Sequence, residues 1–148
     1  MDVALLDDVF KLTTAQEIEV AVRLLLAAVF GSAIGYERRS ADKPAGLRTL
    51  SLVAVGSALF TVISAFGFDA ADQSRVAAQI VTGVGFLGAG TILRSGITIS
   101  GLTTAATIWA TAAIGMAVGS GLYIASVSCT VLILVILYLF SPSRQTEN

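Results

Sequence analysis

The chain has 148 residues, of which 55% are hydrophobic and only 13% are charged. A soluble domain carries roughly 25% charged residues, so this composition argues against a soluble fold. The net charge of −1 gives no basic surface for nucleic acid, and the absence of histidine together with a single cysteine excludes an intrachain disulfide, a Cys/His zinc site and a histidine-based catalytic relay.

Apolar segments dominate the rest of the chain. From residue 47 to residue 140 the only acidic or basic residues are Arg48, Asp69, Asp72, Arg75 and Arg94, so uninterrupted apolar stretches must exceed the roughly 18 to 20 residues that cross a bilayer. A capping box of Thr14 and Glu17 predicts where the first helix begins. We predict a single-domain, all-α membrane protein with five transmembrane helices, at 18–36, 47–68, 76–93, 102–118 and 122–140.

The basic residues predict how these spans are oriented. Six fall on one side, namely Arg38, Arg39, Lys43, Arg48, Arg94 and Arg144, and two on the other, namely Lys11 and Arg75. Cytoplasmic loops of membrane proteins carry an excess of Lys and Arg. We therefore expect the N-terminus outside and the C-terminus inside.

A weak internal repeat relates the first two spans to the next two. A shift of 55 residues aligns six identical residues: Gly35, Arg39, Ser40, Gly46, Leu47 and Thr49 with Gly90, Arg94, Ser95, Gly101, Leu102 and Thr104. Because both matched loops lie on the same side, the repeat is predicted to be parallel, with a pseudo-twofold axis along the membrane normal.

Glycines follow helical spacing in three of the spans. The segment 83–88 matches a GxGxxG dinucleotide fingerprint, but it lies within an apolar span and lacks the acidic residue that binds the ribose, so we reject that reading. Small residues let helices approach closely in membranes. We therefore expect helix packing, or alternatively a dimer seam, at Gly31, Gly35, Gly83, Gly85, Gly88, Gly90, Gly115 and Gly119.

Polar residues gather on the expected cytoplasmic side. The predicted second and fourth helices both follow an Arg-Ser pair, and unpaired N–H groups at helix N-termini attract anions. The candidate polar cluster comprises Glu37, Arg38, Lys43, Arg48, Arg94, Thr103 and Thr104. Two interpretations stay open. The cluster could bind an anion, or the arginines could only set the orientation of the spans and contact lipid. Glu37 and Asp42 could pair with the arginines and fix the loop.

Polar residues also recur near the expected outer side. Asp72, Arg75 and Gln79 share one helical stripe, on which Asp72 could cap the helix and pair with Arg75. The amide of Gln79 must then hydrogen-bond another helix or a permeant species. Arg23 either pairs with Glu19 and extends to the surface or serves a conduction path.

Four longer motifs resemble the MgtC/SapB family of bacterial inner-membrane proteins. They are Glu37-Arg38 followed by residues 43–49 (KPAGLRT), residues 75–81 (RVAAQIV) running into 83–90 (GVGFLGAG), and residues 101–106 (GLTTAA) with Trp109. The resemblance covers about Ile18 to Leu139 and implies five transmembrane helices with the N-terminus outside, in a multi-pass inner-membrane protein. Many family members continue into a soluble cytoplasmic domain, which we expect this chain to lack.

The resemblance also implies a class of function. The family is associated with adaptation to magnesium limitation and with virulence inside host cells, in some members through inhibition of the ATP synthase. We expect a non-enzymatic homodimer in the lipid bilayer, with no cofactor and no metal site, that regulates another membrane complex such as the ATP synthase. The alternative is a small ion or anion transporter or channel formed by an oligomer.

Overall fold

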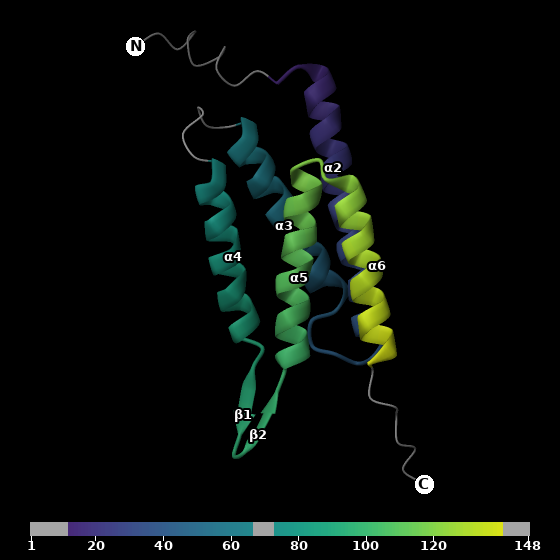
Figure 1. Cartoon of the computed structure of the whole chain (residues 1–148), viewed down its shortest axis with the longest axis vertical. Helices are drawn as coiled ribbons and strands as arrows, with labels where there is room; N and C mark the ends of the chain where they lie inside the picture. The colour runs from purple at the N-terminus through teal and green to yellow at the C-terminus, as the bar shows by residue number, and fades with distance from the viewer. Residues whose placement is uncertain (1–11, 67–72, 141–148) are drawn as a thin grey trace.

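The computed structural model describes residues 12–66 and 73–140. Five helices make up most of this part: α2 Thr14–Ser40, α3 Leu47–Phe66, α4 Gln73–Ala89, α5 Leu102–Gly119 and α6 Tyr123–Leu139 (Figure 1). Two short strands, β1 Leu93–Ser95 and β2 Thr98–Ser100, form an antiparallel hairpin between α4 and α5. The predicted helical class is confirmed, and the hairpin is an element that the sequence analysis did not predict.

The cap of α2 lies one residue before the predicted one. The Thr13 N–H donates to the Gln16 side chain at 2.8 Å, and the Gln16 N–H donates to the Thr13 hydroxyl at 3.4 Å. This pair has the same three-residue spacing that we assigned to Thr14 and Glu17. The shift places the Glu17 carboxylate in the first turn, where the helix dipole stabilises negative charge.

The third helix, α4, ends four residues before the predicted end at residue 93 because the chain leaves the helical path at Gly90. The Thr91 N–H and hydroxyl both donate to the Gly88 carbonyl oxygen, at 3.0 and 2.8 Å, and turn the chain outward. Gly101 closes the same junction with a φ of +87°, and a Cβ there would lie 1.9 Å from the Thr91 carbonyl oxygen. Only glycine fits that position, so the base of the hairpin is fixed to the ends of α4 and α5.

Successive helices run in opposite directions along the long axis of the molecule (Figure 1). One end, here called the hairpin end, carries the hairpin, the 41–46 connection and the end of α6, and the opposite end carries the α5–α6 turn. Helices α2, α3 and α5 are long and apolar enough to cross a membrane, whereas the apolar parts of α4 and α6 are shorter. The chain is thus a helical membrane protein, and its five-span orientation stays a prediction.

The proposed repeat agrees with some helix boundaries and not with others. Helices α3 and α5 begin at Leu47 and Leu102, 55 residues apart as the alignment requires. Helix α2 ends at Ser40, but α4 ends at Ala89, six residues before the repeat would place it. The first connection is a turn and the second is a hairpin, so the repeat also stays a prediction.

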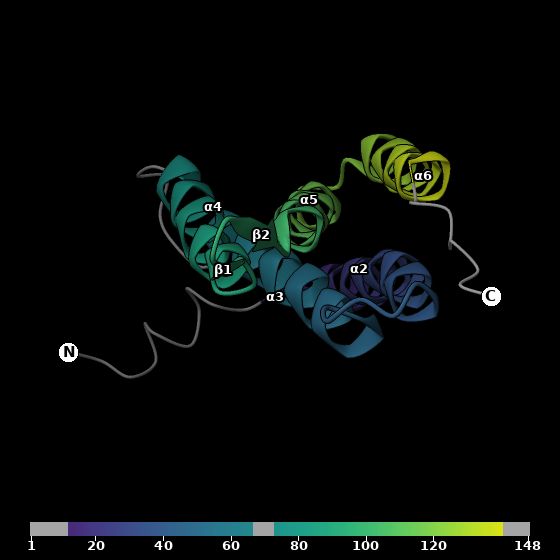
Figure 2. The ribbon, with the colours of Figure 1, turned by 90° about the horizontal axis from the view of Figure 1, so that it is seen from below.

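Helices α2, α3 and α5 pack against one another, and α4 and α6 lie on opposite flanks of this group (Figure 2). Ala54 of α3 is fully buried between two glycines of its neighbours. A Cβ on Gly31 of α2 would lie 2.9 Å from the Ala54 Cβ, and a Cβ on Gly115 of α5 would lie 2.2 Å from the Ala54 carbonyl oxygen. Both neighbours therefore approach α3 so closely that no side chain fits between the helices.

We predict that Gly115→Ala destabilises the bundle and that Gly83→Ala does not. Both changes gain the same helix propensity, about 1 kcal/mol, but only the first forces a methyl group into a backbone, at a cost of about 1–3 kcal/mol or more. No described heavy atom lies within 4 Å of a Cβ built at Gly83. Thermal unfolding in detergent should show a lower midpoint for Gly115→Ala alone, and equal midpoints would contradict the packing.

Candidate functional site

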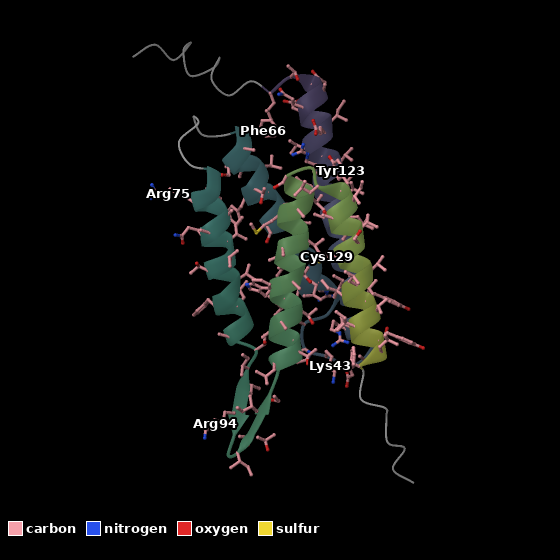
Figure 3. All side chains as sticks on the ribbon, in the orientation of Figure 1. Lys43, Phe66, Arg75, Arg94, Tyr123 and Cys129 are labelled. Atoms are coloured by element: carbon pink, nitrogen blue, oxygen red, sulfur yellow. The ribbon has the colours of Figure 1, made fainter. Side chains whose placement is uncertain are left out.

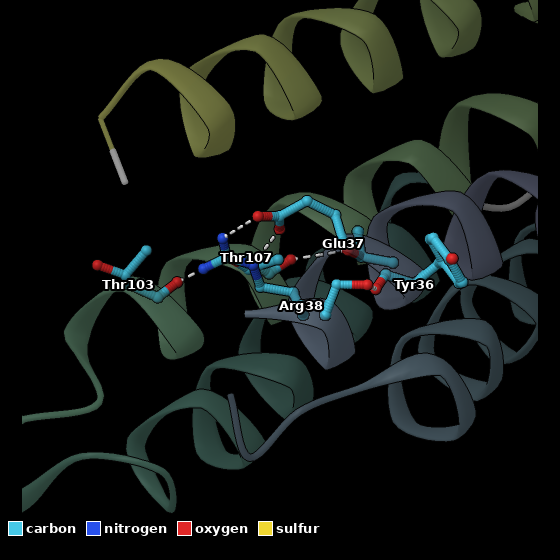
Figure 4. A network of polar contacts seen from close by, with 7 residues as sticks. Tyr36, Glu37, Arg38, Thr103 and Thr107 are labelled. Atoms are coloured by element: carbon cyan, nitrogen blue, oxygen red, sulfur yellow. Dashed lines mark hydrogen bonds and ion pairs between the residues drawn. The ribbon is translucent and has the colours of Figure 1, made fainter. Parts of the chain in front are cut away.

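A buried ion pair lies at the hairpin end of α2. Arg38 is only 4% exposed, and its Nη2 donates to the Glu37 Oε1 at 2.7 Å while its Nε donates to the other carboxylate oxygen. Figure 4 shows the guanidinium pointing toward Thr103 in the first turn of α5. The Glu37 carboxylate therefore neutralises a cation that is held between the end of one helix and the start of another.

The remaining members of the predicted polar cluster are not drawn into this pair. Lys43 and Arg48 are exposed, and Thr104 is buried within the bundle. Arg94 is exposed on the hairpin, where its Nε donates to the Gly96 carbonyl oxygen at 3.1 Å. Figure 3 places Lys43 and Arg94 at the same end of the molecule but on separate elements. The structure thus brings together Glu37, Arg38 and Thr103 and leaves the others apart.

A second arginine, half-buried, lies toward the opposite end of α2. Arg23 Nη2 pairs with Glu19 Oε1 at 2.5 Å, which confirms the predicted pairing, and Nη1 donates to the Gly119 carbonyl oxygen at 2.5 Å. Its Nε is buried without a partner among the described residues. The contact with Gly119 was not predicted, although the Gly-Ser-Gly turn at 119–121 is the signal that a carbonyl there is free to accept.

Two cavities flank α4. A cavity of about 380 Å³ lies beside Arg23 and reaches Thr61, Met116 and Ser120. A larger, mostly apolar one of about 460 Å³ separates α3 from α4, and its wall includes Gln79 and Gly83. Gln79 and Arg75 are both exposed on α4, and Asp72, the third member of the predicted outer stripe, lies outside the described residues.

The predicted packing glycines fall into two groups. Those of α2 and α5 are in close contact with α3: Gly31, Gly35, Gly115 and Gly119. Those of α4 are not, since Gly83 and Gly85 face open space within the described part of the chain and Gly88 makes an ordinary contact with Ala105. Gly90 lies beyond the last turn of α4, near carbonyl oxygens of that same turn. The physical reason is that α4 buries only Ile80 and Val84 as apolar side chains against its neighbours.

The described residues offer no ready metal site. Among them there is no group of three or more His, Cys, Asp or Glu side chains close enough to share an ion. Cys129 on α6 is a free, half-buried thiol. The polar features that remain are the two arginine pairs of α2, the exposed amide of Gln79 and the exposed cation of the hairpin.

These features belong to a helical membrane protein whose polar groups gather near the two ends of the bundle. The chain belongs to the MgtC family, whose sequence model matches residues 24–146. It is 51% identical over 130 residues to a protein of Escherichia coli (strain K12) named "Putative magnesium transporter YhiD", covering 82% of this chain and 60% of that protein.

Two relatives carry the family's own name. Protein MgtC of Brucella abortus (strain 2308) is 47% identical over 119 residues, covering 80% of this chain and 50% of its own length. Protein MgtC of Salmonella typhimurium (strain 14028s / SGSC 2262) is 42% identical over 127 residues, covering 86% and 54%. The chain therefore spans between half and three-fifths of the length of these relatives. No solved structure matches it significantly.

We predict that Glu37→Gln lowers the stability of the bundle by about 1–3 kcal/mol. The substitution keeps the shape of the side chain but leaves the buried Arg38 charge unneutralised, and the partial exposure of Glu37 moderates the cost. Arg39→Ala is the control, since the exposed neighbouring cation contributes under about 1 kcal/mol. Thermal unfolding in detergent measures both, and a shift for Arg39→Ala as large as that for Glu37→Gln would refute the role of the pair.

Proposed function

We propose that this chain is the membrane-embedded part of a non-enzymatic regulator in the bacterial inner membrane. It crosses the membrane five times with its N-terminus outside, and it acts by binding another membrane protein complex. The observation that carries the proposal is one face of α4, on which Gln79, Gly83 and Phe86 follow one another at helical spacing.

This face suits a partner helix better than it suits lipid. Phe86 is 81% exposed, and the space above Gly83 is open within the described part. The Gln79 amide is exposed on a helix that packs against α3 and α5 inside the bundle. Lipid tails cannot hydrogen-bond an amide, whereas a polar side chain on a neighbouring helix can. A glycine beside the amide allows that helix to come close.

The buried hydroxyl groups argue against an anion path through the bundle. Thr107 and Thr111 of α5 donate to carbonyl oxygens one turn earlier, at 2.7 and 2.8 Å. Ser126 and Thr130 of α6 do the same, at 2.8 and 2.7 Å. A hydroxyl that donates to its own helix has no proton left to donate to a permeant anion, and only its lone pairs remain, which suit a cation. These buried hydroxyl groups thus donate their hydrogen bonds within their own helices.

The partner that the family resemblance favours is the proton-driven ATP synthase, with adaptation to magnesium limitation as the setting. A homodimer of this chain would use the same kind of surface. Both are helix-to-helix contacts within the bilayer, so one experiment distinguishes them by the identity of the protein that is captured.

We predict that a photoreactive residue at Phe86 cross-links to a subunit of the ATP synthase in cells limited for magnesium. Ile136 is the matched control, since it is 52% exposed on α6 but has neither glycine nor amide beside it. Gln79→Leu should reduce the Phe86 adduct several-fold, because it removes the hydrogen bond to the partner helix. Mass spectrometry identifies the adduct. Recovery of this chain alone would assign the face to a homodimer, and equal adducts at both positions would refute the proposal.

A second candidate function is transport, which the printed name of the Escherichia coli relative attributes to that protein. The feature that favours it here is the cavity of about 380 Å³ beside Arg23. If the chain is a regulator, proteoliposomes holding it should move magnesium, protons and phosphate no faster than protein-free vesicles. Flux that Arg23→Gln abolishes, with the protein still folded, would replace the regulator with a transporter.

A further inference from the structure

The hairpin is the most exposed element of the described chain. Every residue from Ile92 to Ser100 is exposed. Ile97 at its tip is 99% exposed, Leu93 is 67% exposed and Ile99 is 54% exposed. The strands extend past the ends of α5 and α6 along the long axis (Figure 1). A surface of this kind, with several large apolar side chains uncovered, marks an interaction site.

The charge on this surface has one sign. Arg94 is the only acidic or basic residue between Arg75 and Arg144. Its Nε is held by the Gly96 carbonyl oxygen, which keeps the guanidinium at the turn of the hairpin. The other side chains of the strands are aliphatic or carry hydroxyl groups. Apolar residues beside a cation, without any carboxylate, are typical of segments that lie in the headgroup layer of anionic membranes.

The length of α4 puts the hairpin at the depth of that layer. Its 17 residues rise about 26 Å, less than the roughly 30 Å of bilayer hydrocarbon. A chain that enters at the start of α4 has therefore not left the hydrocarbon when the helix ends at Ala89. The strands of three residues add about 10 Å, which carries Arg94 through the boundary and among the headgroups.

We propose that the hairpin Leu93–Ser100 binds the surface of an anionic bilayer. Arg94 contacts lipid phosphate, while Leu93 at the base of the hairpin and Ile99 opposite Arg94 lie against the glycerol and upper acyl region. A protein that adds a strand to the hairpin is the competing occupant. Strands of three residues offer such a partner few free backbone groups. The close contact of Gly101 with Thr91 fixes the base of the hairpin to the helix ends and so holds it beside the membrane. The inference is independent of the regulator proposed above.

The test places an environment-sensitive fluorophore at Ser95, which leaves the apolar residues and Arg94 intact. Cys129→Ser with Ser95→Cys supplies the single label, and Asp42→Cys in the same background is the control on an exposed turn at the same end. The proteins are reconstituted in phosphatidylcholine vesicles with and without about 30% phosphatidylglycerol, whose negative surface potential attracts basic residues. Spin-labelled lipids report the depth of each label by quenching.

We expect the emission of the Ser95 label to be blue-shifted and quenched in both kinds of vesicle. The quenching should be about two- to fivefold stronger when phosphatidylglycerol is present. Arg94→Gln should remove the phosphatidylglycerol increment and Arg94→Lys should keep it, since only the cation is needed. Ile99→Ser should weaken quenching in both kinds of vesicle. High salt should reduce only the extra quenching that phosphatidylglycerol causes, because salt screens the charge interaction.

Two results would overturn the proposal. A Ser95 label as unquenched as the Asp42 label in both vesicles would show that the hairpin stands in water and awaits a protein. An increment that survives Arg94→Gln would show that another group binds the anionic lipid. Because the chain is studied alone in vesicles, neither result depends on whether it regulates another complex.

Discussion

The rest of the bundle depends on the close approach of α2 and α5 to the backbone of α3. Lipid tails are as apolar as leucine, so burial of apolar side chains does little to hold membrane helices together. Membrane helices instead associate through van der Waals contact between complementary surfaces, and glycine, which has no side chain, allows the closest contact. Gly31 of α2 and Gly115 of α5 both meet α3 at Ala54, and Gly119 meets it again at Ala58. These contacts fix the spacing of three helices, and α4 and α6 then pack around them.

Two arginines of α2, the buried Arg38 and the half-buried Arg23, add contacts to this packing. Arg23 donates to the carbonyl oxygen of Gly119 at the last residue of α5, and Arg38 points toward Thr103 in its first turn. Helix α2 therefore interacts with both ends of α5. Each arginine also has its own carboxylate, Glu19 or Glu37, and burial of an unpaired charge would be far more costly. The same pairs hold α2 and α5 in register along the membrane normal.

The sequence predicted the elements better than their ends and contacts. The apolar runs located all five helices, of which three are long and apolar enough to cross a membrane. The cap of α2 was misplaced by one residue, since Thr13 with Gln16 and Thr14 with Glu17 satisfy the same spacing rule. The hairpin was read as a simple break because its pairing depends on the turn at Gly96 and on the close contact of Gly101 with Thr91. Glycine spacing predicted contacts on α2, α4 and α5 alike, but it cannot tell which stripe faces the centre of a bundle.

The glycine stripe of α4 faces away from the other helices, and it is the surface on which the proposed function depends. Helix α4 has the richest run of glycines in the chain, yet it buries few side chains and borders cavities on two sides. A helix that served only the stability of the bundle would use glycine where another helix of the chain comes close, as α2 and α5 do. Glycines left open beside an exposed amide instead reduce the stability that α4 contributes and preserve room on its surface. The proposed function explains that loss of stability, because a partner helix would then complete the surface of α4.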